Sequence, residues 1–85
     1  MAEGIVILNN EIGLHARPAS MFVREAVKYK SDILVIKNDR SFNAKSIMQV
    51  LSMGAVKGDE LTIRTSGHDE EEALKNLIRL LKEDI

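Results

Sequence analysis

The strongest constraint on the fold is the alternation of short strand-like runs with helical segments along only 85 residues. The aliphatic runs at 5–8 and 33–36 are typical of strands, and 60–65 alternates between apolar and polar side chains as a half-buried strand does. A turn at Asn38–Asp39 can return the chain as a further strand at 41–44. With the helical segments between them, the order of elements is βαββαβα. One sheet with its helices on one face is the simplest packing of that order.

Three segments have apolar residues at helical spacing. The first runs from Ala19 to about Lys28, the second from Ile47 to about Met53, and the third follows Asp69. Asp69 and Glu72 have the spacing of an acidic capping box, which predicts that the third helix starts there. Its apolar stripe contains Ala73, Leu74, Leu77, Ile78 and Leu81. The runs 5–8 and 33–36 are continuously apolar, so we expect aliphatic side chains on the uncovered face of the sheet.

Composition limits the class of protein. The length fits one domain spanning residues 1–85. There is no cysteine, which rules out disulfides and thiolate chemistry and is compatible with the cytoplasm. A net charge of −1 gives no general attraction to nucleic acid or to an anionic membrane. The absence of a signal-like N-terminus and of an apolar run near 20 residues predicts no membrane insertion.

The segment Gly13-Leu14-His15-Ala16-Arg17-Pro18-Ala19 brings an imidazole, a guanidinium and a proline together where a helix starts. Proline fits a first helical turn, because the N–H that it lacks would have no partner there. Helix starts carry free N–H groups and partial positive charge, and the fork of Arg17 matches phosphate oxygens. His15 could therefore accept and hold a phosphoryl group. The alternative is that His15 is a helix cap or a solvated surface residue.

This segment resembles the active-site motif of HPr, the histidine-containing phosphocarrier of the bacterial sugar phosphotransferase system. The resemblance covers almost the whole chain. It implies an α+β open-faced two-layer sandwich, in which a four-stranded antiparallel sheet in the order first, fourth, second, third carries three helices on one face. It also implies that His15, through Nδ1, takes a phosphoryl group from phospho-enzyme I and passes it to the A domain of a sugar permease. Arg17 and the backbone N–H groups of Ala16 and Arg17 would stabilise the phosphate.

A second segment, Lys45-Ser46-Ile47-Met48, is similar to the regulatory-serine region of the Gram-positive branch of that family. Ser46 is a good N-cap residue for the second helix, a role worth about 1 kcal/mol. A phosphate on it would lie at the helix start beside Lys45. The resemblance implies that HPr kinase/phosphorylase modifies Ser46.

The second helix is apolar nearly all round, although a helix on a sheet buries only one face. The exposed remainder could form a docking surface, for which flexible methionine is well suited. The alternative is a short helix sunk in the core. In the family, the positions of Ile47, Met48 and Leu51 contact enzyme I. Gln49 replaces the glycine that many members carry, which leaves fine partner specificity open.

Other candidate sites are weak. His68 lacks an Arg-Pro context, and Gly54 and Gly58 do not have the spacing of a phosphate-binding loop. Two separated histidines predict no metal site, and we expect no cofactor. No constellation indicates a multiple-turnover enzyme. The resemblance implies a phosphocarrier, and we expect it to be a monomer. The alternative function is a regulatory HPr-like protein that binds a catabolite-control transcription regulator through Ser46-phosphate. Direct nucleic-acid binding is disfavoured, because no basic stripe or aromatic platform is visible.

Overall fold

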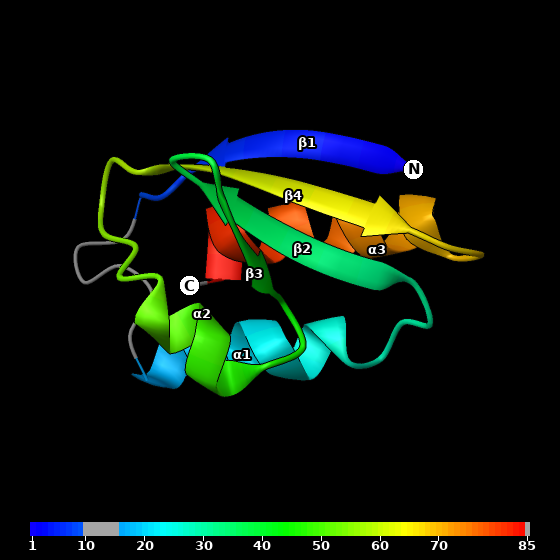
Figure 1. Ribbon diagram of the computed structural model, residues 1–85, viewed down its shortest axis with the longest axis horizontal. Helices are drawn as coiled ribbons and strands as arrows, with labels where there is room; N and C mark the ends of the chain where they lie inside the picture. Colours follow the sequence, from blue (N-terminus) through cyan, green and yellow to red (C-terminus); the bar gives the residue numbers. More distant parts are fainter. Residues whose placement is uncertain (10–15, 85) are drawn as a thin grey trace.

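The computed structural model describes residues 1–9 and 16–84, and Figure 1 shows the path of the chain. Within that part, four strands form one antiparallel sheet in the order β1-β4-β2-β3. The strands are β1 (Ala2–Ile7), β2 (Asp32–Lys37), β3 (Arg40–Asn43) and β4 (Glu60–Ser66). The expected α+β class and strand order are confirmed. Because β4 lies between β1 and β2, the crossover through the first helix creates no parallel pair.

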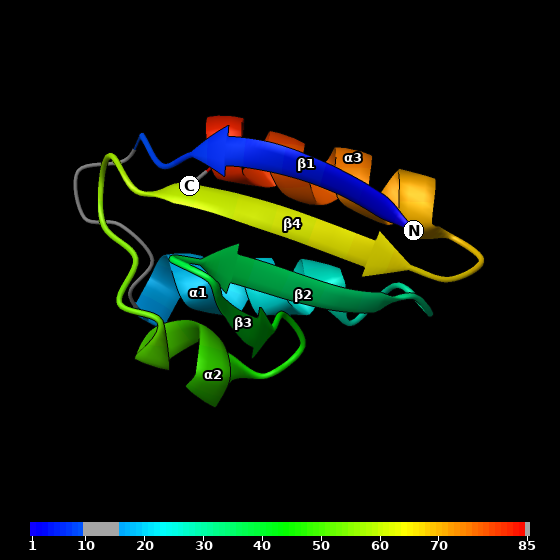
Figure 2. The same cartoon turned by 45° about the horizontal axis from the view of Figure 1, so that its top comes forward.

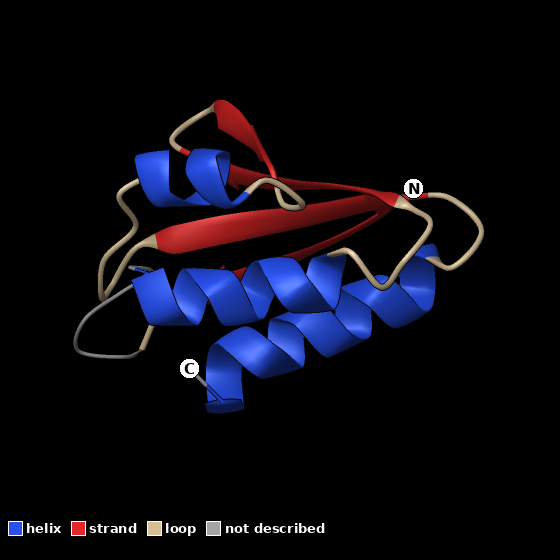
Figure 3. Ribbon diagram, turned by 90° about the horizontal axis from the view of Figure 1, so that it is seen from below, coloured by secondary structure: helices blue, strands red, loops and turns tan. Residues whose placement is uncertain are grey.

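The helices are α1 (Ala16–Ala26), α2 (Ile47–Ser52) and α3 (Glu70–Arg79), and α3 continues as a π-helical turn, η1 (Leu80–Asp84). All three lie on one face of the sheet, with α1 between α2 and α3 (Figure 3). The opposite face is uncovered, as the turned view in Figure 2 shows. The architecture is therefore the open-faced sandwich that the resemblance implied.

Several boundaries differ from the sequence-based prediction. The first strand starts at Ala2 rather than Ile5, because Ala2 pairs with Thr65 of β4. The first helix ends at Ala26, two residues before the predicted end at Lys28. The turn at Asn38–Asp39 is confirmed: both residues have positive φ, 50° and 67°, as a tight two-residue hairpin requires. These differences change element lengths but not topology.

The core lies between the sheet and the helices. Its largest fully buried side chains include Leu8, Phe22, Ile33, Leu61, Ile63 and Leu77. On the uncovered face, Ile5 and Ile7 of β1 are 59% and 57% exposed. The expected aliphatic side chains on that face are thus confirmed. Beside them, Glu3 of β1 and Arg64 of β4 form an ion pair across neighbouring strands.

A polar link joins the end of α1 to α3. The hydroxyl of Tyr29 donates to Glu25 Oε2 at 2.7 Å and accepts from Asn76 Nδ2 of α3 at 2.7 Å. The bond from Tyr29 lowers the pKa of Glu25, whereas burial raises the pKa of the Tyr29 phenol. These bonds fix the C-terminal end of the helix whose first turn carries the His15 motif.

The predicted capping box at Asp69 is wrong. Asp69 is the residue before α3, but its side chain makes no capping hydrogen bond. Its carboxylate instead accepts from Lys30 N at 2.9 Å, Ser31 N at 3.0 Å and Ser31 Oγ at 2.5 Å. Asp69 therefore joins the loop before β2 to the start of α3. These hydrogen bonds, with that from the Ser31 hydroxyl largest, lower the pKa of Asp69 from 3.8 to about 2.

The low pKa of Asp69 makes stability depend on pH in a defined range. A carboxylate whose pKa is lower in the folded state stabilises the fold above its unfolded value and loses that effect as pH falls through the folded one. Asp69→Asn should therefore lower the melting temperature at pH 7. The difference from wild type should shrink as pH falls from about 4 towards 2. Thermal melts from pH 7 to pH 2 measure it, with Glu71→Gln as the charge-loss control. A difference that stays constant over this range would contradict the account.

Candidate functional site

The motif that carries His15 meets the described structure at the start of α1. Gly13, Leu14 and His15 lie outside the described residues, so the predicted acceptor imidazole has no structural account. The second half of the motif opens α1, which begins at Ala16, the residue after His15 in the sequence. Pro18 falls in the first turn, where it costs no helical hydrogen bond. Ala19 is fully buried and anchors this turn in the core.

Arg17 lies exposed in the first turn of α1. Among the described residues, no carboxylate or carbonyl bonds to its guanidinium, and the first turn contains no acidic residue. The first N–H groups of α1, including those of Ala16 and Arg17, have no partner within the helix. The described half of the motif thus presents a free cationic fork beside free N–H donors, an arrangement suited to an anion.

Ser46 is the N-cap of α2, as the sequence predicts. Its side chain accepts a hydrogen bond from Gln49 N at 3.3 Å. The Lys45 ammonium donates to the carbonyl of Tyr29 at 2.7 Å, where it supports the connection after α1. Because an ammonium has three N–H donors, this bond leaves two of them for other acceptors, and the place of Lys45 beside a phosphate on Ser46 stays a prediction.

The predicted docking residues are exposed on α2. Met48 is 75% exposed, and Ile47 and Leu51 are each 37% exposed, whereas Val50 is fully buried. The alternative that α2 is sunk in the core is therefore wrong. Val56, which follows α2, is also 53% exposed and was not identified from the sequence, because nothing in its neighbours marks it as outward-facing.

The relative direction of the two helices decides how the two predicted sites relate. The ribbon views show α2 beside the first half of α1, with the two helices running in opposite directions (Figures 1 and 3). The C-terminal end of α2, rather than Ser46, is thus nearest the start of α1. Ser46 is set back by the length of α2, about 9 Å for six residues. The docking residues lie on the same helix that separates the two sites.

Long-range polar contacts hold α2 in place, and no local sequence pattern predicts them. Lys37 Nζ of β2 donates to the carbonyls of Met53 at 3.2 Å and Gly54 at 3.3 Å, just after α2. The same ammonium forms an ion pair with Asp59 at 3.3 Å. Gln49 Oε1 accepts from Asn43 N of β3 at 2.8 Å. Both ends of α2 are therefore tied to the sheet.

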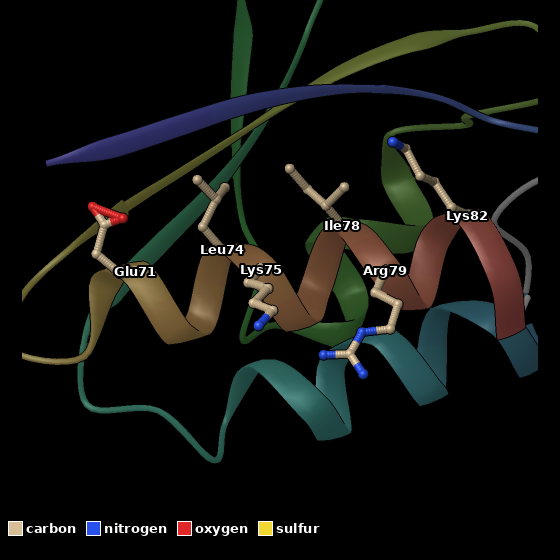
Figure 4. A pocket seen from close by; sticks show the side chains of 6 residues that line it. All are labelled: Glu71, Leu74, Lys75, Ile78, Arg79 and Lys82. Carbon is tan, nitrogen blue, oxygen red and sulfur yellow. The ribbon is translucent and has the colours of Figure 1, made fainter.

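The structure shows a hollow of about 380 Å³ on the outer side of α3 (Figure 4). It is lined by Glu71, Leu74, Lys75, Ile78, Arg79 and Lys82, none of which is a predicted site residue. In the part of the chain that the structure describes, no three His, Cys, Asp or Glu side chains gather closely enough to hold a metal ion. Nor does any helix there combine the length and hydropathy that a membrane span requires.

Comparison with known proteins identifies the family. Residues 2–83 match the model of the HPr component of the phosphotransferase system, described by its phosphorylation site. The phosphocarrier protein HPr of Mycoplasma capricolum is 43% identical over 75 residues, which are 88% of this chain and 84% of that protein.

Solved structures agree with that match. HPr of Thermoanaerobacter tengcongensis superposes with a TM-score of 0.93 at 44% identity, covering 96% of this chain and 92% of that one. Crh of Bacillus subtilis, a catabolite-repression protein solved as a dimer with a swapped domain, gives 0.79 at 39% identity, covering 100% and 98%. With its motif at the start of α1, its sheet order and these matches, the chain belongs to the HPr family of phosphocarrier proteins, which act as carriers rather than as catalytic enzymes.

Proposed function

We propose that His15 accepts a phosphoryl group from phospho-enzyme I and passes it to the A domain of a sugar permease in the cytoplasm. The observation that carries the proposal is the exposed guanidinium of Arg17, which has no partner within residues 1–9 and 16–84. Arg17 follows His15 by two positions in the sequence and lies in a first helical turn with no acidic residue. A neutral imidazole nitrogen attacks the phosphorus, the new N–P bond forms, and the bond from phosphorus to the donor atom of enzyme I breaks. Arg17 and the N–H groups of Ala16 and Arg17 stabilise the charge on the transferred group.

The docking surface in this proposal consists of Ile47, Met48 and Leu51. These three side chains are exposed on α2, beside the helix that starts at the His15 motif. Exposed aliphatic side chains and a flexible methionine can fit both a phosphoryl donor and several acceptors in turn. Enzyme I and the permease domain would therefore use one surface at different times, which a carrier requires.

A regulatory function at Ser46 is the second part of the proposal. HPr kinase/phosphorylase would phosphorylate the Ser46 hydroxyl at the edge of the docking surface. The similarity over the full chain to Crh, whose name refers to catabolite repression, supports a regulatory role. In this proposal Ser46-phosphate binds a catabolite-control transcription regulator. The presence of His15 favours a phosphocarrier over a purely regulatory protein, because a purely regulatory protein does not need an acceptor imidazole. The monomer stays a prediction, and the swapped dimer of the Crh relative is its alternative.

Arg17→Ala tests the mechanism apart from the fold. Since Arg17 is exposed, the variant should lose only about 0.5 kcal/mol and keep its melting temperature within a few degrees. Phosphoryl transfer from enzyme I should slow at least about tenfold, because a preorganised donor to the developing charge is lost. Arg17→Lys, which keeps the charge but not the planar fork, should be intermediate. Rapid-quench labelling measures the rates, and a wild-type rate for Arg17→Ala would remove Arg17 from the mechanism.

A further inference from the structure

Three hydrogen bonds form a closed circuit around Ser46. Asn43 N donates to Gln49 Oε1 at 2.8 Å, Gln49 N donates to Ser46 Oγ at 3.3 Å, and Ser46 N donates to the carbonyl of Asn43 at 3.1 Å. Each of the three residues therefore donates to the next. The circuit connects the end of β3, the N-cap and the first turn of α2.

Only the bond from Asn43 N to Gln49 Oε1 depends on which side chain stands at position 49. Asn43 ends an edge strand, and its N–H would otherwise bond to water. The bond from Asn43 N is short, whereas the bond from Gln49 N to Ser46 Oγ is near the long limit for such contacts. The shorter bond from Asn43 N thus holds residue 49 where its own N–H can reach Ser46 Oγ. Asn43 Oδ1 also accepts from Lys45 N at 2.9 Å, which steadies the turn before Ser46.

This geometry bears on the chemistry of Ser46. When Ser46 is phosphorylated, Oγ attacks the terminal phosphorus of a nucleoside triphosphate. The O–P bond forms, the bond to the nucleoside diphosphate breaks, and the hydroxyl proton passes to a base of the kinase. An Oγ that accepts from Gln49 N is held in one rotamer with a lone pair engaged. An attack from this position can use only the second lone pair of Oγ, so release of the capping bond should favour the reaction.

We propose that Gln49 is a positioning residue that clamps the Ser46 hydroxyl in its capping position and so slows phosphorylation of Ser46. The inference rests on the proposed regulatory function of that serine. A glycine at position 49 could not make the bond from Asn43, so the clamp belongs to the glutamine that this chain carries. Gln49 is exposed, which allows its substitution without a cavity in the core.

Amide hydrogen exchange tests the clamp without any kinase. Gln49→Met keeps the length of the side chain but removes the acceptor, whereas Gln49→Glu keeps an acceptor oxygen. After correction for side-chain effects on exchange, the amides of residues 43 and 49 should exchange about three- to tenfold faster in Gln49→Met, the fold-change that loss of one exposed hydrogen bond gives. Gln49→Glu should be close to wild type. Ser46→Ala should speed only the amide of residue 49. An unchanged residue-49 amide in Gln49→Met would overturn the clamp.

Kinase kinetics test its consequence. With HPr kinase/phosphorylase and ATP, Gln49→Met should raise kcat for Ser46 about threefold, because the hydroxyl is freed from the clamp. An equal kcat, or an effect in KM alone, would overturn the regulatory consequence. If neither wild type nor variant takes phosphate at Ser46, the proposed regulatory function fails instead, and the exchange result still decides the clamp.

Discussion

His15→Ala is expected to accept no phosphoryl group from enzyme I while remaining folded. The chain has two histidines and no cysteine, so the loss of His15 leaves no nucleophile in the Arg-Pro context. The described half of the motif, from Ala16 to Ala19, packs in the core through the fully buried Ala19. The substitution therefore removes the acceptor and leaves the α1 core contacts in place.

His68→Ala is the matched control. His68 is exposed and follows Gly67 in the loop before α3, where it has neither an arginine nor a helix start of the same kind beside it. This variant should be labelled to the wild-type level of one phosphoryl group per chain. Circular dichroism and thermal melts confirm that both variants fold. Stoichiometric labelling of His15→Ala would show that the acceptor lies elsewhere.

The second large effect is expected when Ser46 is phosphorylated. The phosphate adds nearly two negative charges beside Ile47 and Met48, where we propose that enzyme I docks. The complex must then desolvate a neighbouring dianion, which costs binding free energy. Apparent affinity for enzyme I should fall by at least about tenfold, which corresponds to 1.4 kcal/mol. Since the C-terminal end of α2, rather than Ser46, lies nearest the start of α1, we expect the effect to act through docking.

Ser46→Asp should show the same effect in smaller size, because it carries one charge. Aspartate is also a good N-cap, so α2 and the melting temperature should be retained. Ser41→Asp places the same charge on an exposed residue of β3 and should leave affinity unchanged. The rate of His15 labelling against protein concentration measures apparent affinity for the four proteins. Equal affinities would reduce Ser46 to a helix cap.

The sequence alone predicted the element types, because periodicity and turn residues are local. It did not determine the strand order, which the resemblance supplied and the pairings of β4 with β1 and β2 confirm. The exposed isoleucines of β1 show a second limit of prediction from the sequence alone. A continuous apolar run indicates a strand but not whether both faces are covered.

The polar contacts that local patterns missed have partners far away in the sequence. Asp69 has the spacing of a cap, but the N–H groups of Lys30 and Ser31 compete successfully for its carboxylate. Lys45 is adjacent to Ser46 in sequence, and the Tyr29 carbonyl takes its ammonium. Local patterns carry no information on such contacts, because the donors and acceptors meet only after the sheet and helices have packed.

The most direct test of the account is to locate the phosphate on the unmodified chain. The protein is incubated with enzyme I and phosphoenolpyruvate, and the acid-labile phosphate is mapped by phosphorus NMR and by mass spectrometry of peptides kept at neutral or alkaline pH. The account predicts one phosphoryl group per chain, on the imidazole of His15, and its loss when a permease A domain is added. Phosphate on His68 or on a hydroxyl, or no phosphate at all, would contradict it.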